Sequence, residues 1–407
     1  MTSSTPASRG AATMALLSLA IGAFGIGMTE FVSMGLLPDI ARDLLPEIFR
    51  ASEEQAVARA GILITLYAAG VVVGAPTIAA VVSRYPRHRV MLALAAALLV
   101  FNLLTVIAPT FELVAVSRFL SGLPHGAFFG MAAIVASDIM GPARRGRGVA
   151  LVMSGLTVAN LVGVPGGTAL GQALGWRAAY VVVAAVLALA TVMCALFVPA
   201  RPGDPSRTFR QELGVFRIPQ VWLTAAYGAI GFSGFFAVYS YVATLVTEVS
   251  GADASVVPIA VVALGGGMVV GNLVAGWLAD ISVKRALFAG FGALAAASVV
   301  VGVVSSWTVP LIIALFVFGA AGQIALPVIQ LRLLDVAREH QAIGAALNHS
   351  ALNIGNGLGA ALGGLVIAAH WGYVAPVWLG AVLACAGIVI AAVAFALDRR
   401  SRGRVAA

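Results

Sequence analysis

Charged residues are scarce in this chain, and lysine is almost absent. Only 10% of the 407 residues are Asp, Glu, Lys or Arg, and Lys284 is the single lysine. A phosphate-binding loop of the GxxxxGK[ST] type needs a lysine after a glycine. Lys284 follows a valine, so ATP-driven transport through a site of the chain's own is excluded. The net charge of +8 does not indicate a nucleic-acid partner, because the basic residues form short clusters between apolar runs.

Cysteines are few, and the common catalytic patterns are missing. The two cysteines, Cys194 and Cys385, lie inside apolar runs, so a disulfide framework is not expected. The chain has no G-x-S-x-G, no H-E-x-x-H and no His/Cys cluster with metal-ligand spacing. We therefore expect no enzyme activity, no cofactor and no metal site.

Long apolar runs dominate what is present. Hydrophobic residues make up 61% of the chain, and the mean hydropathy is +1.03. A water-soluble chain of this composition would aggregate, whereas a lipid bilayer would accommodate about twelve helices of ~20 residues. We expect an all-α integral membrane protein with twelve transmembrane helices, near residues 13–38, 58–82, 90–108, 112–138, 148–172, 178–199, 218–247, 256–280, 286–305, 310–335, 342–368 and 375–397.

The stretch from Gly148 to Trp176 is repeated 196 residues later, from Gly344 onward. The coinciding pairs are Gly148/Gly344, Ala150/Ala346, Leu151/Leu347, Ser154/Ser350, Leu156/Leu352, Asn160/Asn356, Gly163/Gly359 and Gly167/Gly363. Such self-similarity at half the chain length indicates duplication. An even number of spans in each half makes the two six-helix repeats parallel. The predicted halves are residues 1–199 and 218–407, joined by a polar linker at 200–217.

Basic residues are distributed unevenly between the two ends of the predicted spans. Of the 24 Lys and Arg residues, 19 fall on the side of the N-terminus, four fall on the other side, and Arg118 lies inside a span. Basic loops face the cytoplasm in membrane proteins. Both termini and the linker are therefore predicted to be cytoplasmic.

Two charged residues, Glu30 and Arg118, lie deep within predicted spans, away from the span ends. An ionisable group in a span costs several kcal/mol and is a functional hypothesis by default. The repeat aligns Glu30 with Phe236 and Arg118 with Leu315, so the second half folds without either charge. At 1.5 Å per residue, both lie roughly 7–10 Å from the midplane, on the outer side. The alternative is a charge pair that only locks two helices.

Other polar residues inside the spans are candidates for proton transfer or for lining a substrate cavity. His125 follows Arg118 by seven residues on the same helical face; it is either a proton carrier or a neutral packing histidine. His349, Asn353 and Asn356 share a face, although Asn356 and its twin Asn160 can equally bond a neighbouring helix. The cavity candidates are Tyr239, Gln323, His349, Asn353 and Asn356.

Two further groups of residues have gating and packing interpretations. Acidic residues end spans at the inner face, where they either gate the passage or anchor a helix to loop arginines. The gating candidates are Asp138, Asp280, Lys284, Arg285 and Asp335. Small residues at four-residue steps let helices approach closely in lipid. The packing and bending candidates are Gly163, Pro165, Gly166, Gly167, Gly359 and Gly363.

Several motifs resemble those of the major facilitator superfamily. Residues 276–285, GWLADISVKR, look like its loop signature after the second span of a half; the first-half counterpart has Ser83 in place of the aspartate. Thr29-Glu30-Phe31 and residues 35–41, GLLPDIA, resemble the opening of its twelve-span drug/proton antiporters. Residues 118–128 and 163–167 are similar to the arabinose-efflux and chloramphenicol-resistance type permeases.

This resemblance implies a proton-coupled exporter of a small organic compound, such as a drug or a sugar, in the bacterial inner membrane. Alternating access would rock the two halves about a central cavity. Glu30, Arg118 and His125 are the proton-coupling candidates, and we expect a monomer. The alternatives are an uncoupled facilitator, a proton-coupled sugar or nucleoside transporter, an intramembrane enzyme and a transport-inactive receptor.

The loop signature generates a test of the gate. Asp280, with Lys284 and Arg285, is expected to close the inner side around the eleventh span. The Asp280→Asn variant should transport more slowly, because the charge that holds the gate is gone, while ligand binding to the purified protein stays largely intact. Transport assays and equilibrium binding on the same preparation measure both properties. Loss of binding by a folded variant would place Asp280 in the ligand site instead.

Overall fold

The computed structural model describes residues 9–82, 85–141, 145–201, 213–337 and 341–405. Within these ranges, twelve helices are long and apolar enough to cross a membrane, and no residue is in a strand. The predicted all-α membrane fold with twelve spans is therefore confirmed. The central part of the predicted linker, 202–212, lies outside the described residues.

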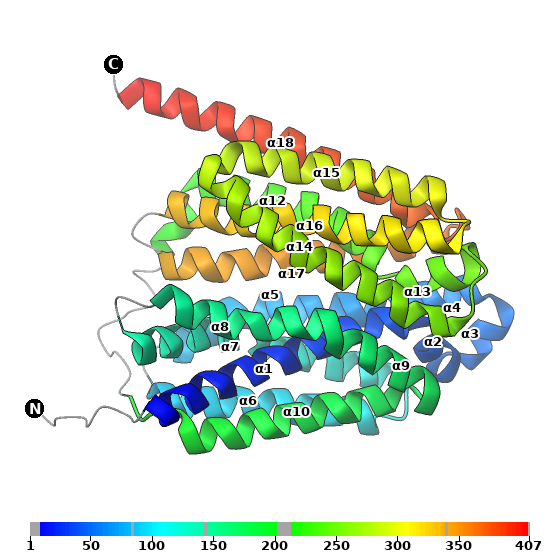
Figure 1. The fold of residues 1–407 in the computed structure, drawn as a ribbon, viewed down its shortest axis with the longest axis horizontal. Helices are drawn as coiled ribbons and strands as arrows, with labels where there is room; N and C mark the ends of the chain where they lie inside the picture. The colour runs from blue at the N-terminus through cyan, green and yellow to red at the C-terminus, as the bar shows by residue number, and fades with distance from the viewer. Residues whose placement is uncertain (1–8, 83–84, 142–144, 202–212, 338–340, 406–407) are drawn as a thin grey trace, which may run out of the picture.

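Each half contributes six spanning helices (Figure 1). In the first half they are α1 (Arg9–Gly35), α5 (Ile62–Val82), α6 (Arg87–Ile107), α7 (Phe111–Met140), α8 (Arg145–Val158) continuing through the π-helical turn η2 (Ala159–Gly163) into α9 (Val164–Leu174), and α10 (Trp176–Phe197). In the second half they are α12 (Pro219–Tyr239), α14 (Val257–Ile281), α15 (Val283–Val304), α16 (Thr308–Ala337), α17 (Gln341–Ala368) and α18 (Ala375–Val405).

The seventh span is shorter than predicted. We expected it to reach residue 247, but α12 ends at Tyr239. The chain leaves helical geometry at Tyr241 and then forms α13 (Val242–Thr244) and the π-helical turn η4 (Leu245–Val249). All residues from 240 to 246 are buried inside the protein, and most of them are apolar, so the apolar run continues through the break. A hydropathy pattern alone cannot reveal such a break.

The loop after the first span folds into three short helices. They are α2 (Leu37–Leu44), α3 (Pro46–Ala51) and α4 (Glu53–Ala60). Pro46 begins α3, and the Ser52 side chain caps α4 by accepting a hydrogen bond from the Gln55 N–H, as prolines and serines commonly do at helix starts. Two of the three helices, α2 and α4, bury one face against the protein.

The two ends of the helix bundle differ in how the halves pack. We call the end that carries α2, α3 and α4 the α3 end, and the opposite end, which carries the chain termini, the linker end (Figure 1). One hydrophobic cluster at the α3 end contains residues of both halves, such as Phe31 and Tyr241. Toward the linker end, one cluster belongs to the first half and another to the second half. The halves therefore share a core at the α3 end and have separate cores at the linker end.

Glycines allow the same close helix contact in both halves. A Cβ placed on Gly122 of α7 would overlap the backbone carbonyl of Tyr67 in α5. The equivalent Gly319 of α16 lies against the carbonyl of Leu264 in α14 in the same way. Backbone contact of this kind is available only to residues without a side chain. The duplicated sequence thus produces a duplicated helix contact.

This contact predicts different outcomes for one substitution at two sites of α7. Gly122→Leu should lower the thermal stability of the purified protein by an amount corresponding to about 1–3 kcal/mol or more, because overpacking forces α5 and α7 apart. Gly130→Leu is the matched control, since no atom lies within 4 Å of a Cβ at Gly130. Thermal unfolding in detergent measures both. Equal melting temperatures for the two variants would contradict the close contact.

Candidate functional site

Glu30 lies at the junction between the halves, near the α3 end of α1. Its side chain is buried, with 6% of the residue exposed. One carboxylate oxygen, Oε1, accepts a hydrogen bond of 3.2 Å from Nδ2 of Asn356. Asn356 is on α17 and therefore belongs to the other half. The predicted intramembrane acid is thus in direct contact with both halves.

Arg118 on α7 is buried beside Glu30 but is held by other groups. Its Nη1 donates to the Thr29 hydroxyl at 3.0 Å, and its guanidinium lies 4.3 Å from the centre of the Tyr67 ring. Thr29 in turn donates to the Asn102 side chain. Among the described residues, no ion pair joins Arg118 to Glu30, so the charge pair of the alternative interpretation is not formed; the hydroxyl and the aromatic face hold the guanidinium.

His125 and His349 face each other across the junction. The Tyr67 hydroxyl and Nδ1 of His125 are 2.9 Å apart. Tyr67 therefore contacts His125 through its hydroxyl and Arg118 through the face of its ring. The ring centres of His125 and His349 are 6.4 Å apart. His349 also stacks on Phe129 of α7, with ring centres at 5.3 Å. The structure therefore places both predicted histidines in one aromatic cluster near Arg118.

Three of the other cavity candidates have clear positions. Tyr239 donates to Oδ1 of Asn160 at 3.5 Å and stacks on Phe31, so it also lies at the junction. Asn353 donates back to the His349 carbonyl of its own helix at 3.0 Å. Gln323 is half buried on α16 and makes no hydrogen bond with the described residues.

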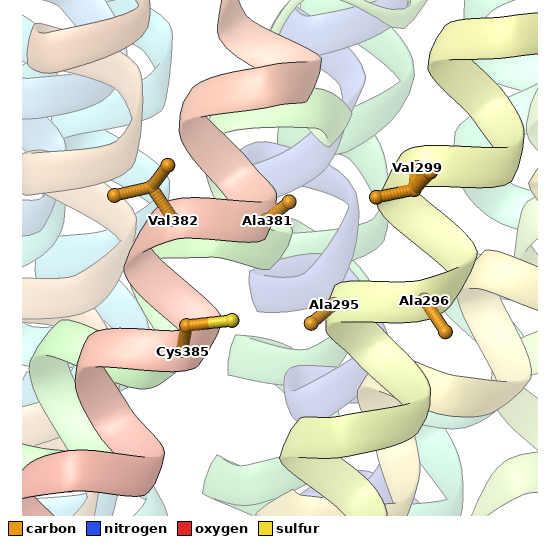
Figure 2. Close-up of a pocket in the computed structure, with 6 residues that line it drawn as sticks. All are labelled: Ala295, Ala296, Val299, Ala381, Val382 and Cys385. Atoms are coloured by element: carbon orange, nitrogen blue, oxygen red, sulfur yellow. The ribbon is translucent and has the colours of Figure 1, made fainter.

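A hollow on the surface lies apart from this site. Figure 2 shows it between α15 and α18, lined by Ala295, Ala296, Val299, Ala381, Val382 and Cys385. Its lining is apolar and contains none of the predicted site residues. Its lining contains no carboxylate or imidazole, so it does not compete with the junction as the candidate proton site.

The gating candidates occupy separate places at the linker end. Asp138 forms an ion pair with Arg87, which anchors α7 to α6. Lys284 lies 5.6 Å from the centre of the Phe395 ring, and Asp335 is exposed. The Arg285 backbone N–H donates to the Ser282 side chain at 3.3 Å, which caps α15. The side chain of Asp280 lies outside the described residues.

Sequence reasoning missed an ion pair at the linker end of the second half. Arg332 of α16 donates to Asp398 of α18 at 2.9 Å, and their side chains are 9% and 19% exposed. Both residues lie near the ends of predicted spans, and their spacing in the sequence does not pair them. Only the packing of α16 beside α18 identifies them as partners.

Most of the packing candidates lie in close helix contacts. Gly163 and Gly167 lie under Met28 and Val32 of α1, and their twins Gly359 and Gly363 lie against α12 and Tyr241. Gly166 differs from the expectation, because it is exposed and no atom lies within 4 Å of a Cβ there.

Pro165 lies two residues after the π-helical turn η2, in the first turn of α9. Proline has no N–H to donate to the residue four positions earlier, and π-helical turns accommodate such a loss. The span is therefore irregular at this proline, as the predicted bending element implied.

Comparisons with known proteins agree with this arrangement. The sequence profile of the Major Facilitator Superfamily matches residues 19–269 and 240–407. This chain belongs to the major facilitator superfamily. Two transport proteins of Escherichia coli K12 are similar over most of their length. The inner membrane transport protein YdhP is 35% identical over 91% of this chain and 92% of that protein, and the transporter AraJ is 33% identical over 86% and 87%.

A chloramphenicol resistance protein of Streptomyces lividans is 28% identical over 92% of this chain and 95% of that protein. Among solved structures, the human organic anion transporter MFSD10 (TETRAN) has the same fold, with a TM-score of 0.67 and 14% identity over 93% of this chain and 99% of that chain. The resemblance read from the sequence motifs is thus confirmed at the level of the superfamily. The chain is a multi-pass membrane transporter of this superfamily.

The hydrogen bond between Thr29 and Arg118 generates a stability prediction. Thr29→Val keeps the shape of the side chain but leaves a buried guanidinium N–H without a partner, which costs about 1–3 kcal/mol. The melting temperature of the purified protein should therefore fall. Thr29→Ser retains the hydroxyl and is the matched control. If the valine and serine variants melt together, the hydroxyl does not hold Arg118.

Proposed function

We propose that this superfamily member is a proton-coupled exporter, an antiporter that exchanges protons for a small organic compound. The observation that carries the proposal is the buried carboxylate of Glu30, which accepts a hydrogen bond from the opposite half. A proton that binds there alters a contact between the two bodies that must move. Proton binding and conformational change are therefore linked at one residue.

The surroundings of Glu30 support a carboxyl group that gains and loses a proton. A permanently ionised carboxylate inside a membrane span is costly unless it is paired with a positive charge. Arg118 is close, but its described hydrogen bond goes to Thr29 rather than to Glu30. Burial and a nearby positive charge act in opposite directions on the protonation of a carboxyl group. This combination suits a group that binds a proton reversibly.

The packing of the halves supports alternating access. With the linker end in the cytoplasm, as the basic residues predict, the shared core at the α3 end closes the outer side. The separate cores toward the linker end permit each half to move as a body. Rocking would open the α3 end and bring the linker ends together. We assign this structure to the inward-facing side of that cycle.

The direction and substrate class rest on the relatives. The chloramphenicol resistance protein is named for resistance to a drug, which is consistent with export of small organic compounds. The junction of this chain combines aromatic rings, such as Tyr239 and Phe129, with amide groups, such as Asn353 and Asn356. Such a surface suits an amphipathic or neutral polar compound. The inner membrane of a bacterium is the proposed location, as for the relative YdhP.

Replacing Glu30 tests proton coupling. Glu30→Gln imitates the protonated carboxyl group permanently, so a pH gradient can no longer drive transport. In liposomes with an imposed pH gradient, uphill export should vanish, whereas downhill or exchange flux of a neutral substrate persists. An export screen of the overexpressed protein across drugs, sugars and nucleosides supplies the substrate for this assay.

Glu112→Gln is the control for this experiment, because Glu112 undergoes the same change at an exposed position at the start of α7. It should transport like the unmodified protein. A Glu30→Gln variant that still concentrates substrate against its gradient would show that Glu30 is not the coupling residue.

A further inference from the structure

Two asparagines at equivalent positions of the repeat cross the junction in opposite directions. Asn160 belongs to the fifth span and Asn356 to the eleventh, 196 residues apart. Oδ1 of Asn160 accepts from Tyr239 on the first span of the second half, at 3.5 Å. Nδ2 of Asn356 donates to Glu30 on the first span of the first half, at 3.2 Å. Each half thus contacts the first span of the other through the same asparagine.

The two links differ in the chemistry of the partner. Tyr239 offers a neutral hydroxyl, whereas Glu30 offers a carboxyl group whose charge depends on its proton. An amide N–H bonded to an ionised carboxylate forms a charge-assisted hydrogen bond, roughly twice as strong as a neutral one. Protonation of Glu30 therefore weakens the Asn356 link and leaves the Asn160 link unchanged.

The groups around Glu30 belong to both halves, so only those of the first half keep their place beside it when the halves move apart. Arg118 and Tyr67 interact with Glu30 electrostatically, but both belong to the first half. From the second half, Tyr239 and Asn356 are the groups that interact with it among the described residues. His125 and His349 lie behind Tyr67, on α7 and α17. Opening of the α3 end would remove Asn356 from Glu30 and leave Arg118 in place.

We propose that Asn356 is the positioning residue through which the proton on Glu30 sets the packing of the two halves. This inference rests on the proposed function. With Glu30 ionised, the Asn356 link holds α17 against α1 and keeps the α3 end packed. Protonation weakens the link, and the α3 end opens. In the open state Glu30 has lost an N–H donor that favours its ionised form, so it takes up a proton from that side.

The Asn356 amide oxygen supports this assignment. Oδ1 of Asn356 is buried and has no hydrogen-bond partner among the described residues. The amide is therefore held at the junction through its N–H group alone. A residue whose other polar atom was also bonded would stay in place when Glu30 became protonated.

Spin labels on the two halves at the α3 end measure this movement. Glu47 on α3 and Trp371 after α17 are exposed and belong to different halves. The probe is the distance distribution between labels on Glu47→Cys and Trp371→Cys, with both native cysteines replaced by alanine, in lipid nanodiscs from acid to alkaline pH. In the unmodified background, acidification should raise the ratio of open to packed molecules roughly fivefold, as expected from the loss of one charge-assisted hydrogen bond.

The variants separate the two asparagines. The His370–Glu54 ion pair also joins the halves at the α3 end, so Glu30→Gln, which retains that pair, defines the background pH response. Asn356→Ala should show only this background and fewer packed molecules at alkaline pH. Asn160→Ala is the matched control; it should reduce the packed population at every pH and keep the full pH response. If Asn356→Ala does not fold, Asn356→Ser replaces it, because serine also removes the amide group that bonds Glu30.

The outcomes distinguish this inference from the proposed function. A full pH response in the Asn356 variants, with the response lost in Glu30→Gln, overturns the role of Asn356 and leaves Glu30 as the proton site. The same pH response in Glu30→Gln and in the unmodified protein overturns the proton-coupling role of Glu30 itself. A pH response lost in Asn160→Ala as well would show that any weakening of the junction has this effect, which contradicts the special position of Asn356.

Discussion

A carboxyl group inside a membrane span must be neutral, paired or exposed to water, and this constraint organises the centre of the molecule. Glu30 is buried and bonded to an amide of the other half, and its neighbouring arginine is held by a threonine and an aromatic ring. The bilayer offers no solvent to compensate a charge that appears there. When Glu30 gains or loses a proton, the contacts of the protein around it must therefore change to compensate the change in charge. In this molecule the available contact is the one between the halves.

Duplication explains why such a site is possible without loss of the fold. The repeat gives Phe236 and Leu315 at the positions of Glu30 and Arg118, and both residues are buried. Phe236 stacks with Phe31, with ring centres at 6.3 Å, so the second half fills the junction with apolar surface. The close helix contacts through glycine are the same in both halves. The helix contacts are thus shared by both halves, whereas the two charged residues of the site belong to the first half.

Much of the fold could be predicted from the sequence, because the bilayer makes hydropathy and span length decisive. The twelve spans and the superfamily were predicted correctly from the apolar runs, the repeat and the loop motifs. The break after Tyr239 and the three helices between α1 and α5 were not, because those residues are apolar or amphipathic in either conformation.

The candidate site was predictable only in part. Glu30 and Arg118 were visible as charges inside spans, but their partners were not. The bonds to Asn356 and Thr29 join helices that are distant in sequence, and residue spacing along one helix carries no information about them. Gly166 shows the converse, since its place in the glycine motif 163–167 marked it for packing although its side of the helix is exposed.

The central claim is that Glu30 binds and releases a proton within the membrane. Infrared difference spectroscopy of the purified protein in lipid, recorded between acid and alkaline pH, measures this directly, because a protonated carboxyl group has a carbonyl band that the carboxylate lacks. The account predicts such a band in the unmodified protein and its absence from Glu30→Gln. The same difference band in both proteins would show that another group titrates and would contradict the account.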